Sequence, residues 1–150
     1  MNRIHATCVA FEGQAILLQG ASESGKSDLA LRLMDQGWHL VADDYTELTL
    51  EEDGQLYASP PDTLKGLIEI RGIGLIRVPY KTHVPVIAIF DLQDLNKIER
   101  LPKPAHLSLE GLRVPLYTLH GLDASAPAKI RLTLKAQAEH LFYNLEAEDA

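Results

Sequence analysis

Short runs of apolar residues with the two-residue period of β-strands dominate the first two-thirds of the chain. Alternating apolar residues mark a strand that is buried on one face, and a continuous apolar run marks a strand that is buried on both faces. The run at 84–90 is of the second kind, which predicts a central strand that ends at Asp91. The other strands are predicted at 4–11, 14–19, 39–42, 45–50, 55–59, 67–70 and 75–78, with one or two more within 107–119.

Turn residues separate several of these strands. Glu12-Gly13 and Asp53-Gly54 each lie between two predicted strands and predict two hairpins. Asp-Gly is typical of such turns because short hairpin loops need residues that accept a positive φ. Residues 71–74 are expected to form a tight loop, and residues 93–104, which are polar and contain prolines, a surface loop.

The first helix is predicted at 27–36. Leu29, Leu33 and Met34 recur at helical spacing and share one face. Gly37 can adopt the left-handed conformation that commonly ends a helix.

A second helix is predicted near the end of the chain. It starts at Asp123 or Ser125, with Pro127 in its first turn. Its apolar face, which is expected to lie against the sheet, comprises Ile130, Leu134, Ala138, Leu141 and Leu145. A mixed central sheet with flanking helices is an α/β fold, and the length suits one domain over residues 1–150.

Composition narrows the choice of function classes. The chain is 46% hydrophobic and 23% charged, and its net charge of −7 argues against a nucleic-acid-binding surface. The one cysteine, Cys8, cannot form an internal disulfide and is expected to be a small buried hydrophobe. The sequence has no secretory signal and no apolar run of membrane-spanning length, so we expect no membrane association and a cytoplasmic location.

The most specific motif is GASESGKS at residues 20–27. It matches the phosphate-binding pattern G-x-x-x-x-G-K-[ST] at every required position, between a predicted strand and a predicted helix. Backbone N–H groups of such a loop and the positive end of the helix bind phosphates. Lys26 can reach the terminal phosphates, and the Ser27 hydroxyl can bind Mg²⁺. The expected nucleotide-binding residues are Gly20, Ala21, Ser22, Glu23, Ser24, Gly25, Lys26 and Ser27.

Charged residues at two later points could serve phosphoryl transfer. Asp43 and Asp44 end the strand at 39–42, and the pair could hold Mg²⁺ and accept a proton, or be a solvated turn. Glu69 lies in the apolar strand LIEI, where a carboxylate needs a partner such as Mg²⁺ or Arg71 unless it faces outward. Arg71 could clamp a phosphate or pair with a carboxylate.

The histidines give no metal-binding pattern. His5 carries no functional signal by itself, and the others lack the spacing of zinc ligands, so no zinc site is predicted. These others are His39, His83, His106, His120 and His140.

Together these motifs resemble the catalytic domain of HPr kinase/phosphorylase, the bacterial enzyme that phosphorylates a serine of the phosphocarrier protein HPr. The resemblance covers about residues 4–100. Four segments carry it in order. They are His5, GASESGKS at 20–27, GWHLVADD at 37–44 (the family's G-x-x-L-V-A-D-D), and IEIRGIGLI at 68–76 (its E-I-R-G-x-G).

The resemblance implies ligands, a partner and a fold. Lys26 and the loop amides would bind ATP, and Ser27 and Glu69 would hold Mg²⁺. The acceptor would be HPr, and the assembly a homo-oligomer, by family analogy a hexamer. The implied fold is the variant P-loop kinase fold that the family shares with phosphoenolpyruvate carboxykinase.

The resemblance also implies catalytic roles. Asp44 would be the base that activates the substrate serine, with Asp43 beside it and His5 assisting. Arg71 belongs to the family's catalytic strand and loop. Arg100, in the segment Glu99-Arg100-Leu101, looks like a family arginine in an equivalent position.

The chain departs from the family pattern at four points. Ala6 replaces a glycine, and Glu23 stands where the family usually has one, although a carboxylate near a triphosphate is unfavourable unless it points into water. The family's N-terminal regulatory domain is expected to be absent, as in the short form of alphaproteobacteria. The loop that the family uses for phosphorolysis is not recognisable, and APAKIRL at 126–132 occupies its region. Kinase activity is therefore better supported than phosphorolysis.

Three functions fit the sequence. The first is a Mg²⁺-ATP-dependent protein serine kinase that acts on HPr. The second is a P-loop kinase for a small metabolite, and the third is a nucleotide-sensing module that binds ATP without turnover. Transfer of labelled phosphate to a serine of HPr would distinguish the first from the other two.

Overall fold

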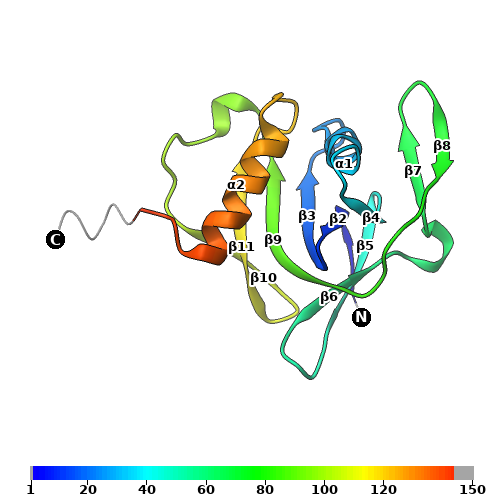
Figure 1. The fold of residues 1–150 in the computed structure, drawn as a ribbon, viewed down its shortest axis with the longest axis horizontal. Helices are drawn as coiled ribbons and strands as arrows, with labels where there is room; N and C mark the ends of the chain where they lie inside the picture. Colours follow the sequence, from blue (N-terminus) through cyan, green and yellow to red (C-terminus); the bar gives the residue numbers. More distant parts are fainter. Residues whose placement is uncertain (1, 144–150) are drawn as a thin grey trace.

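A mixed sheet forms the centre of the computed structural model, which describes residues 2–143 (Figure 1). Within these residues the sheet has nine strands, in which the pairs β3–β9 and β9–β11 are parallel and the others antiparallel. Its main path is β1 (Asn2–His5), β5 (Tyr45–Leu50), β6 (Leu56–Ser59), β9 (Val84–Leu92), β3 (Gln14–Gly20), β2 (Thr7–Phe11) and β4 (His39–Ala42), with β11 (Leu112–Leu119) beside β9 and β10 (Ala105–Leu109) beside β11.

Helices and a separate hairpin complete the described part. The two longer helices pack on the same face of β3 and β9, and the hairpin stands at the edge of the molecule (Figure 1). These elements are α1 (Lys26–Met34), α2 (Ala126–Glu139), the short 3₁₀ helices η1 (Asp62–Leu64) and η2 (Leu95–Lys97), and the hairpin strands β7 (Leu67–Ile70) and β8 (Gly74–Arg77). No helix in residues 2–143 is long and apolar enough to cross a membrane.

The strands β2 and β3 are buried on both faces. Ile16 and Leu18 pack with the residues of α1 and α2, while Cys8 and Leu17 pack with residues of β5 and β6. Successive side chains of a strand point to opposite faces, so two cores form around the same pair of strands. The buried position predicted for Cys8 is confirmed, and burial raises the pKa of its thiol far above the usual range.

The prediction of one strand at 4–11 is wrong in one respect. The strand is interrupted at Ala6, and the segments on either side have different partners. The strand β1 pairs with β5, whereas β2 pairs with β3 and β4. At this interruption the Thr46 hydroxyl donates a hydrogen bond to the Ala6 carbonyl at 2.8 Å, so the carbonyl has a partner although Ala6 belongs to neither strand. The strand predicted to end at Asp91 continues to Leu92.

The two predicted hairpins are confirmed, and α1 ends two residues earlier than expected. Gly37 has the predicted left-handed conformation, with φ of 97°, and its N–H donates to the Met34 carbonyl. The hairpin turns place β2 against β3 and β5 against β6.

The helix α2 is shorter than predicted. It ends at Glu139 because His140 adopts a left-handed conformation, with φ of 55°. Ala136 takes the buried position expected for Ala138, which is exposed, as is Leu141. Ser125 is the capping residue, but its side chain makes no capping hydrogen bond. Leu145 lies outside the described residues.

Candidate functional site

The loop at residues 20–27 joins the carboxyl end of β3 to the first turn of α1. Gly20 has a φ of 148°, and a Cβ there would lie 2.8 Å from the carbonyl oxygen of Leu92. Gly25 has a φ of 96°, and a Cβ there would lie 2.8 Å from the Leu122 side chain. Both positions therefore require glycine, and together they let the backbone curl tightly at the start of a helix, where anions bind.

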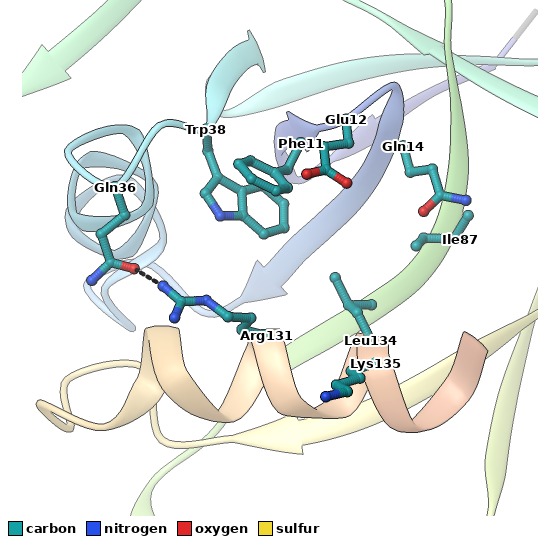
Figure 2. Close-up of a pocket in the computed structure, with 9 residues that line it drawn as sticks. All are labelled: Phe11, Glu12, Gln14, Gln36, Trp38, Ile87, Arg131, Leu134 and Lys135. Atoms are coloured by element: carbon teal, nitrogen blue, oxygen red, sulfur yellow. Dashed lines mark hydrogen bonds between the residues drawn. The ribbon is translucent and has the colours of Figure 1, made fainter. Parts of the chain in front are cut away.

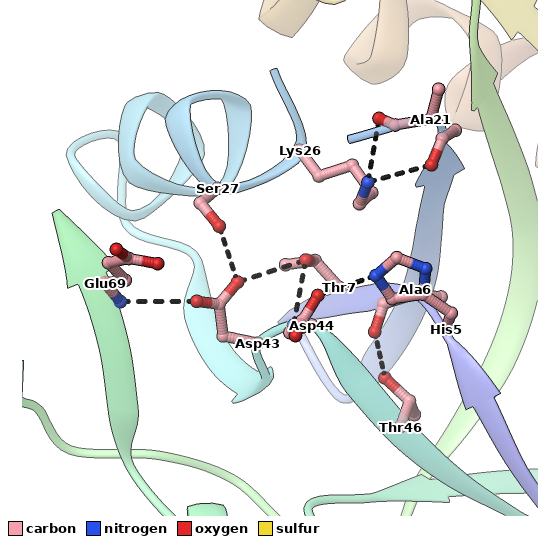
Figure 3. Close-up of polar contacts among 11 residues, drawn as sticks. His5, Ala6, Thr7, Ala21, Lys26, Ser27, Asp43, Asp44, Thr46 and Glu69 are labelled. Carbon is pink, nitrogen blue, oxygen red and sulfur yellow. Dashed lines mark hydrogen bonds and ion pairs between the residues drawn. The ribbon is translucent and has the colours of Figure 1, made fainter. Parts of the chain in front are cut away.

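Lys26 holds a positive charge inside this loop. The side chain is buried, and its Nζ donates hydrogen bonds to the carbonyl oxygens of Gly20 at 2.8 Å and Ala21 at 3.1 Å (Figure 3). A buried ammonium group is tolerated because these bonds replace its contacts with water. The loop also contains one buried hydroxyl, Ser24 Oγ, that has no hydrogen-bond partner in the described residues.

Asp43 connects the phosphate loop to the sheet. The residue is only 8% exposed, and Figure 3 shows donors from three elements directed at its carboxylate. Oδ1 accepts hydrogen bonds from Ser27 Oγ at 2.7 Å and from Thr7 Oγ1 at 3.1 Å. Oδ2 accepts the backbone N–H of Glu69 at 3.3 Å. One carboxylate therefore fixes α1, β2 and β7 relative to one another.

Asp44 has a different environment from its neighbour. Its side chain is 59% exposed, and its Oδ1 lies 2.7 Å from Nε2 of His5. The backbone of Asp44 is in the left-handed region, with φ of 68°, and the carboxylates of Asp43 and Asp44 lie in different surroundings. Its N–H donates to Thr7 Oγ1 at 3.3 Å. Adjacent carboxylates in unlike environments are suited to different chemical roles.

Thr7 is a residue that the sequence analysis missed. It is fully buried, donates to the Asp43 carboxylate and accepts the N–H of Asp44. One hydroxyl thus positions both carboxylates. The sequence offered one signal, a polar residue at the start of an otherwise apolar strand, two positions after His5. The role of this residue follows only from the pairing of β2 with β4, which brings Thr7 to the residues that follow β4.

Glu69 and Ser27 lie on either side of Asp43. The backbone of Glu69 binds Asp43, whereas its carboxylate is exposed and makes no hydrogen bond or ion pair within residues 2–143. The same residues hold no cluster of three or more His, Cys, Asp or Glu side chains suited to a metal ion. Mg²⁺ does not require such a cluster, since it is usually held by one or two protein oxygens together with water and substrate phosphates.

Arg71 contacts the phosphate loop through Glu23. Its Nη2 lies 3.7 Å from Oε1 of Glu23, so it pairs with this residue and not with Glu69. The two side chains are 83% and 74% exposed, and an ion pair so exposed contributes little to stability. The exposed Glu23 carboxylate lies in water, which reduces the electrostatic cost of a carboxylate near phosphates.

The backbone of Glu23 is in the left-handed region, with φ of 67°, where a side chain costs about 1 kcal/mol. Glu23→Gly is therefore expected to be more stable than Glu23→Ala by about 1 kcal/mol, because both variants lose the ion pair but only glycine relieves the backbone. Urea unfolding measures the difference. Equal stabilities of the two variants would show that the loop backbone is unstrained at this position.

Arg100 is not brought to these residues. It is exposed in the loop between β9 and β10 and makes no hydrogen bond or ion pair within the described part of the chain. The other predicted residues, from the phosphate loop to Arg71, surround the carboxyl ends of β3 and β4.

A cavity of about 320 Å³ lies at the opposite end of β3, between the β2–β3 turn and α2 (Figure 2). Arg131 donates a hydrogen bond to Gln36 there at 3.3 Å. The cavity contains none of the predicted site residues. It is lined by Phe11, Glu12, Gln14, Gln36, Trp38, Ile87, Arg131, Leu134 and Lys135.

Known proteins are similar to this chain in sequence and in structure. The model of the family described as HPr Serine kinase C-terminal domain matches residues 1–119, which include every predicted site residue. A solved structure of the Hpr(Ser) kinase/phosphatase from Coxiella burnetii is similar, with a TM-score of 0.82 and 26% identity, over 94% of this chain and 99% of that chain.

Curated relatives are similar over part of their length. The HPr kinase/phosphorylase of Geobacillus sp. (strain WCH70) is 37% identical over 103 residues, covering 63% of this chain and 33% of the relative. That of Brevibacillus brevis (strain 47 / JCM 6285 / NBRC 100599) is 33% identical over 125 residues, covering 83% and 40%. The chain therefore spans between a third and two-fifths of the length of these relatives.

Proposed function

The chain belongs to the HPr serine kinase C-terminal domain family, and we propose that it is a Mg²⁺-ATP-dependent kinase that phosphorylates a serine of HPr. One observation carries the proposal. The hydrogen bond between Ser27 Oγ and Asp43 Oδ1, at 2.7 Å, ties a phosphate-binding loop to a strand end that bears a second, solvent-open carboxylate, Asp44. A phosphate donor site and a proton acceptor are thus adjacent.

The loop would bind the phosphates of ATP. Lys26 would exchange its bonds to the carbonyls of Gly20 and Ala21 for bonds to phosphate oxygens. The N-terminus of α1 would contribute backbone donors and the positive end of its dipole. This exchange keeps the ammonium group satisfied in both states.

The oxygen atoms around Asp43 fit a magnesium ion. Ser27 and Glu69 would hold it, and Asp43, which binds both residues, would keep their positions. Hydroxyl and carboxylate oxygens are the donors that this hard cation takes. When bound, Mg²⁺ would neutralise negative charge on the terminal phosphates.

Asp44 would act on the acceptor. As the serine oxygen forms its bond to the γ-phosphorus and the bond between that phosphorus and the ADP oxygen breaks, the serine proton would pass to the Asp44 carboxylate. His5, 2.7 Å from that carboxylate, would orient it. Arg71 would add positive charge near the transferred group.

Two surface features support a protein acceptor over a small metabolite. Asp44 is open to solvent, so a partner must cover it to exclude water during transfer. The β7–β8 hairpin, which also carries Glu69 and Arg71, exposes the large apolar side chains of Ile73 and Leu75. Exposed apolar groups beside a reactive site are typical of protein-binding surfaces.

The family also suggests finer properties, which we include in the proposal. Residues 1–150 would form one kinase domain with the variant P-loop fold of phosphoenolpyruvate carboxykinase. The strand β3, between parallel β9 and antiparallel β2, supports that fold. The protein would act as a homo-oligomer in the cytoplasm. In phosphorolysis, inorganic phosphate would attack phosphoserine, giving pyrophosphate and free HPr.

Incubation of the protein with purified HPr, Mg²⁺ and γ-labelled ATP tests the proposal. We expect label on one serine of HPr, and none on an HPr variant with that serine replaced by alanine. Adding inorganic phosphate to labelled HPr tests phosphorolysis. Labelling of a small metabolite in place of HPr would make the protein a metabolite kinase, and binding of ATP without transfer to any acceptor would make it a nucleotide sensor.

A further inference from the structure

A second cavity of about 320 Å³ adjoins the phosphate loop. One wall is the loop at residues 21–24. The other walls come from the last residue of β9 and from residues that follow β9 and β11. They include Leu92, Asp94, Lys97, His120 and Leu122.

This cavity and the proposed reacting groups lie on opposite sides of β3. The loop follows β3, whose neighbours are β2 on one side and β9 on the other. Asp43 and Asp44 follow β4, beyond β2, and the cavity lies beyond β9. A linear nucleotide whose terminal phosphate faces Asp44 can therefore direct its other end toward the cavity.

The cavity is continuous with the loop. A Cβ on Gly25 would lie 2.8 Å from Leu122, and a Cβ on Gly121 would lie 2.8 Å from Leu92 and 3.1 Å from the Ser24 carbonyl oxygen. Residues 21–24 of the loop themselves line the cavity. A ligand whose phosphates occupy the loop can thus extend into the cavity.

The walls combine apolar and polar groups. Leu92 and Leu122 provide apolar contact. His120 is held by a hydrogen bond between its Nδ1 and the Gln93 carbonyl at 3.1 Å, which fixes its ring. Asp94 and Lys97 add charged groups. Small-molecule sites carry polar groups at fixed positions and have volumes from about 300 Å³ upward, and this cavity is of that size.

We propose that this cavity binds the nucleoside of the nucleotide substrate. The base packs against Leu122 and Leu92, and the ribose hydroxyls bind the polar groups at the rim, Asp94 among them. This inference rests on the proposed function, because it assumes that the loop binds nucleotide phosphates. The cavity near Arg131 cannot serve, since the seven residues of β3 separate it from the loop by about 20 Å.

The experiment compares ATP with inorganic tripolyphosphate, which lacks a nucleoside. Calorimetric titration in one Mg²⁺ buffer gives the affinity of each ligand for the wild type, Leu122→Asn and Leu132→Ala. Leu122 is 58% exposed, so its replacement is compatible with folding. Leu132, on α2, is 66% exposed, does not line the cavity and is the control position.

We expect the wild type to bind ATP more tightly than tripolyphosphate. Leu122→Asn should weaken ATP binding about tenfold and leave tripolyphosphate binding within about twofold, with Leu132→Ala like the wild type for both ligands. Equal affinity of the wild type for the two ligands, or equal weakening of both by Leu122→Asn, overturns the proposal. These outcomes do not involve HPr, so they are distinct from failure of the proposed kinase activity, which the transfer assay reports.

Discussion

Replacing Asp44 with asparagine is expected to slow phosphoryl transfer to HPr by about 10²- to 10⁴-fold, the usual contribution of a general base. Asparagine keeps the shape of the side chain and an oxygen that His5 can bind, but it cannot accept the serine proton. Asp44 makes no hydrogen bond to the phosphate loop among the described residues, so ATP affinity should change by less than about threefold.

Rapid-quench transfer kinetics and calorimetric ATP titration separate these two effects. Asp35→Asn, in an exposed position at the far end of α1 from the loop, is the control and should match the wild type in both measurements. Transfer at the wild-type rate by Asp44→Asn would show that Asp44 is not the base. A parallel loss of ATP affinity would show that the residue shapes the binding site instead.

The same substitution at the neighbouring position should have a different outcome. Asp43→Asn replaces one acceptor oxygen with an NH₂ group, although Ser27, Thr7 and the Glu69 N–H all donate to the native carboxylate. At least one buried donor then loses its acceptor, which costs about 1–3 kcal/mol of folding free energy. The Ser27 hydroxyl also loses its fixed position, so Mg²⁺-dependent ATP binding should weaken together with transfer.

Urea unfolding and ATP titration with and without Mg²⁺ measure these effects. Asp44→Asn is the matched comparison, and because its side chain is exposed it should stay within about 0.5 kcal/mol of the wild-type stability. If Asp43→Asn had wild-type stability and normal Mg²⁺-dependent binding, the carboxylate would not organise the site. The two adjacent variants thus test the division of roles between Asp43 and Asp44.

Local patterns account for what could be predicted from the sequence. The phosphate loop depends on glycines at set spacings between a strand and a helix, and Gly37 and Asp53-Gly54 act through their own backbone. The apolar run of β9 likewise identified the central strand, which pairs with β3, β6 and β11. Such features need no knowledge of distant residues.

The missed features depend on contacts between distant segments. The strand break at Ala6 follows from pairing with β5, about forty residues later in the chain. The role of Thr7 arises only when β2 lies beside β4 and brings the hydroxyl to Asp43. Likewise the partner of Arg71 proved to be Glu23, in the phosphate loop, because the β7–β8 hairpin packs beside α1.

In the proposed mechanism, one site joins the phosphate loop to Asp44 and transfers phosphate to a protein serine. Its most direct test is a single-turnover experiment in which excess protein is first saturated with γ-labelled ATP and Mg²⁺ and then mixed with HPr. Because ATP is already bound, the measurement reports transfer alone. We expect label on one serine of HPr with the wild type and a rate at least about 10²-fold lower with Asp44→Asn. Bound ATP that transfers no label to HPr, or equal rates for the two proteins, would contradict it.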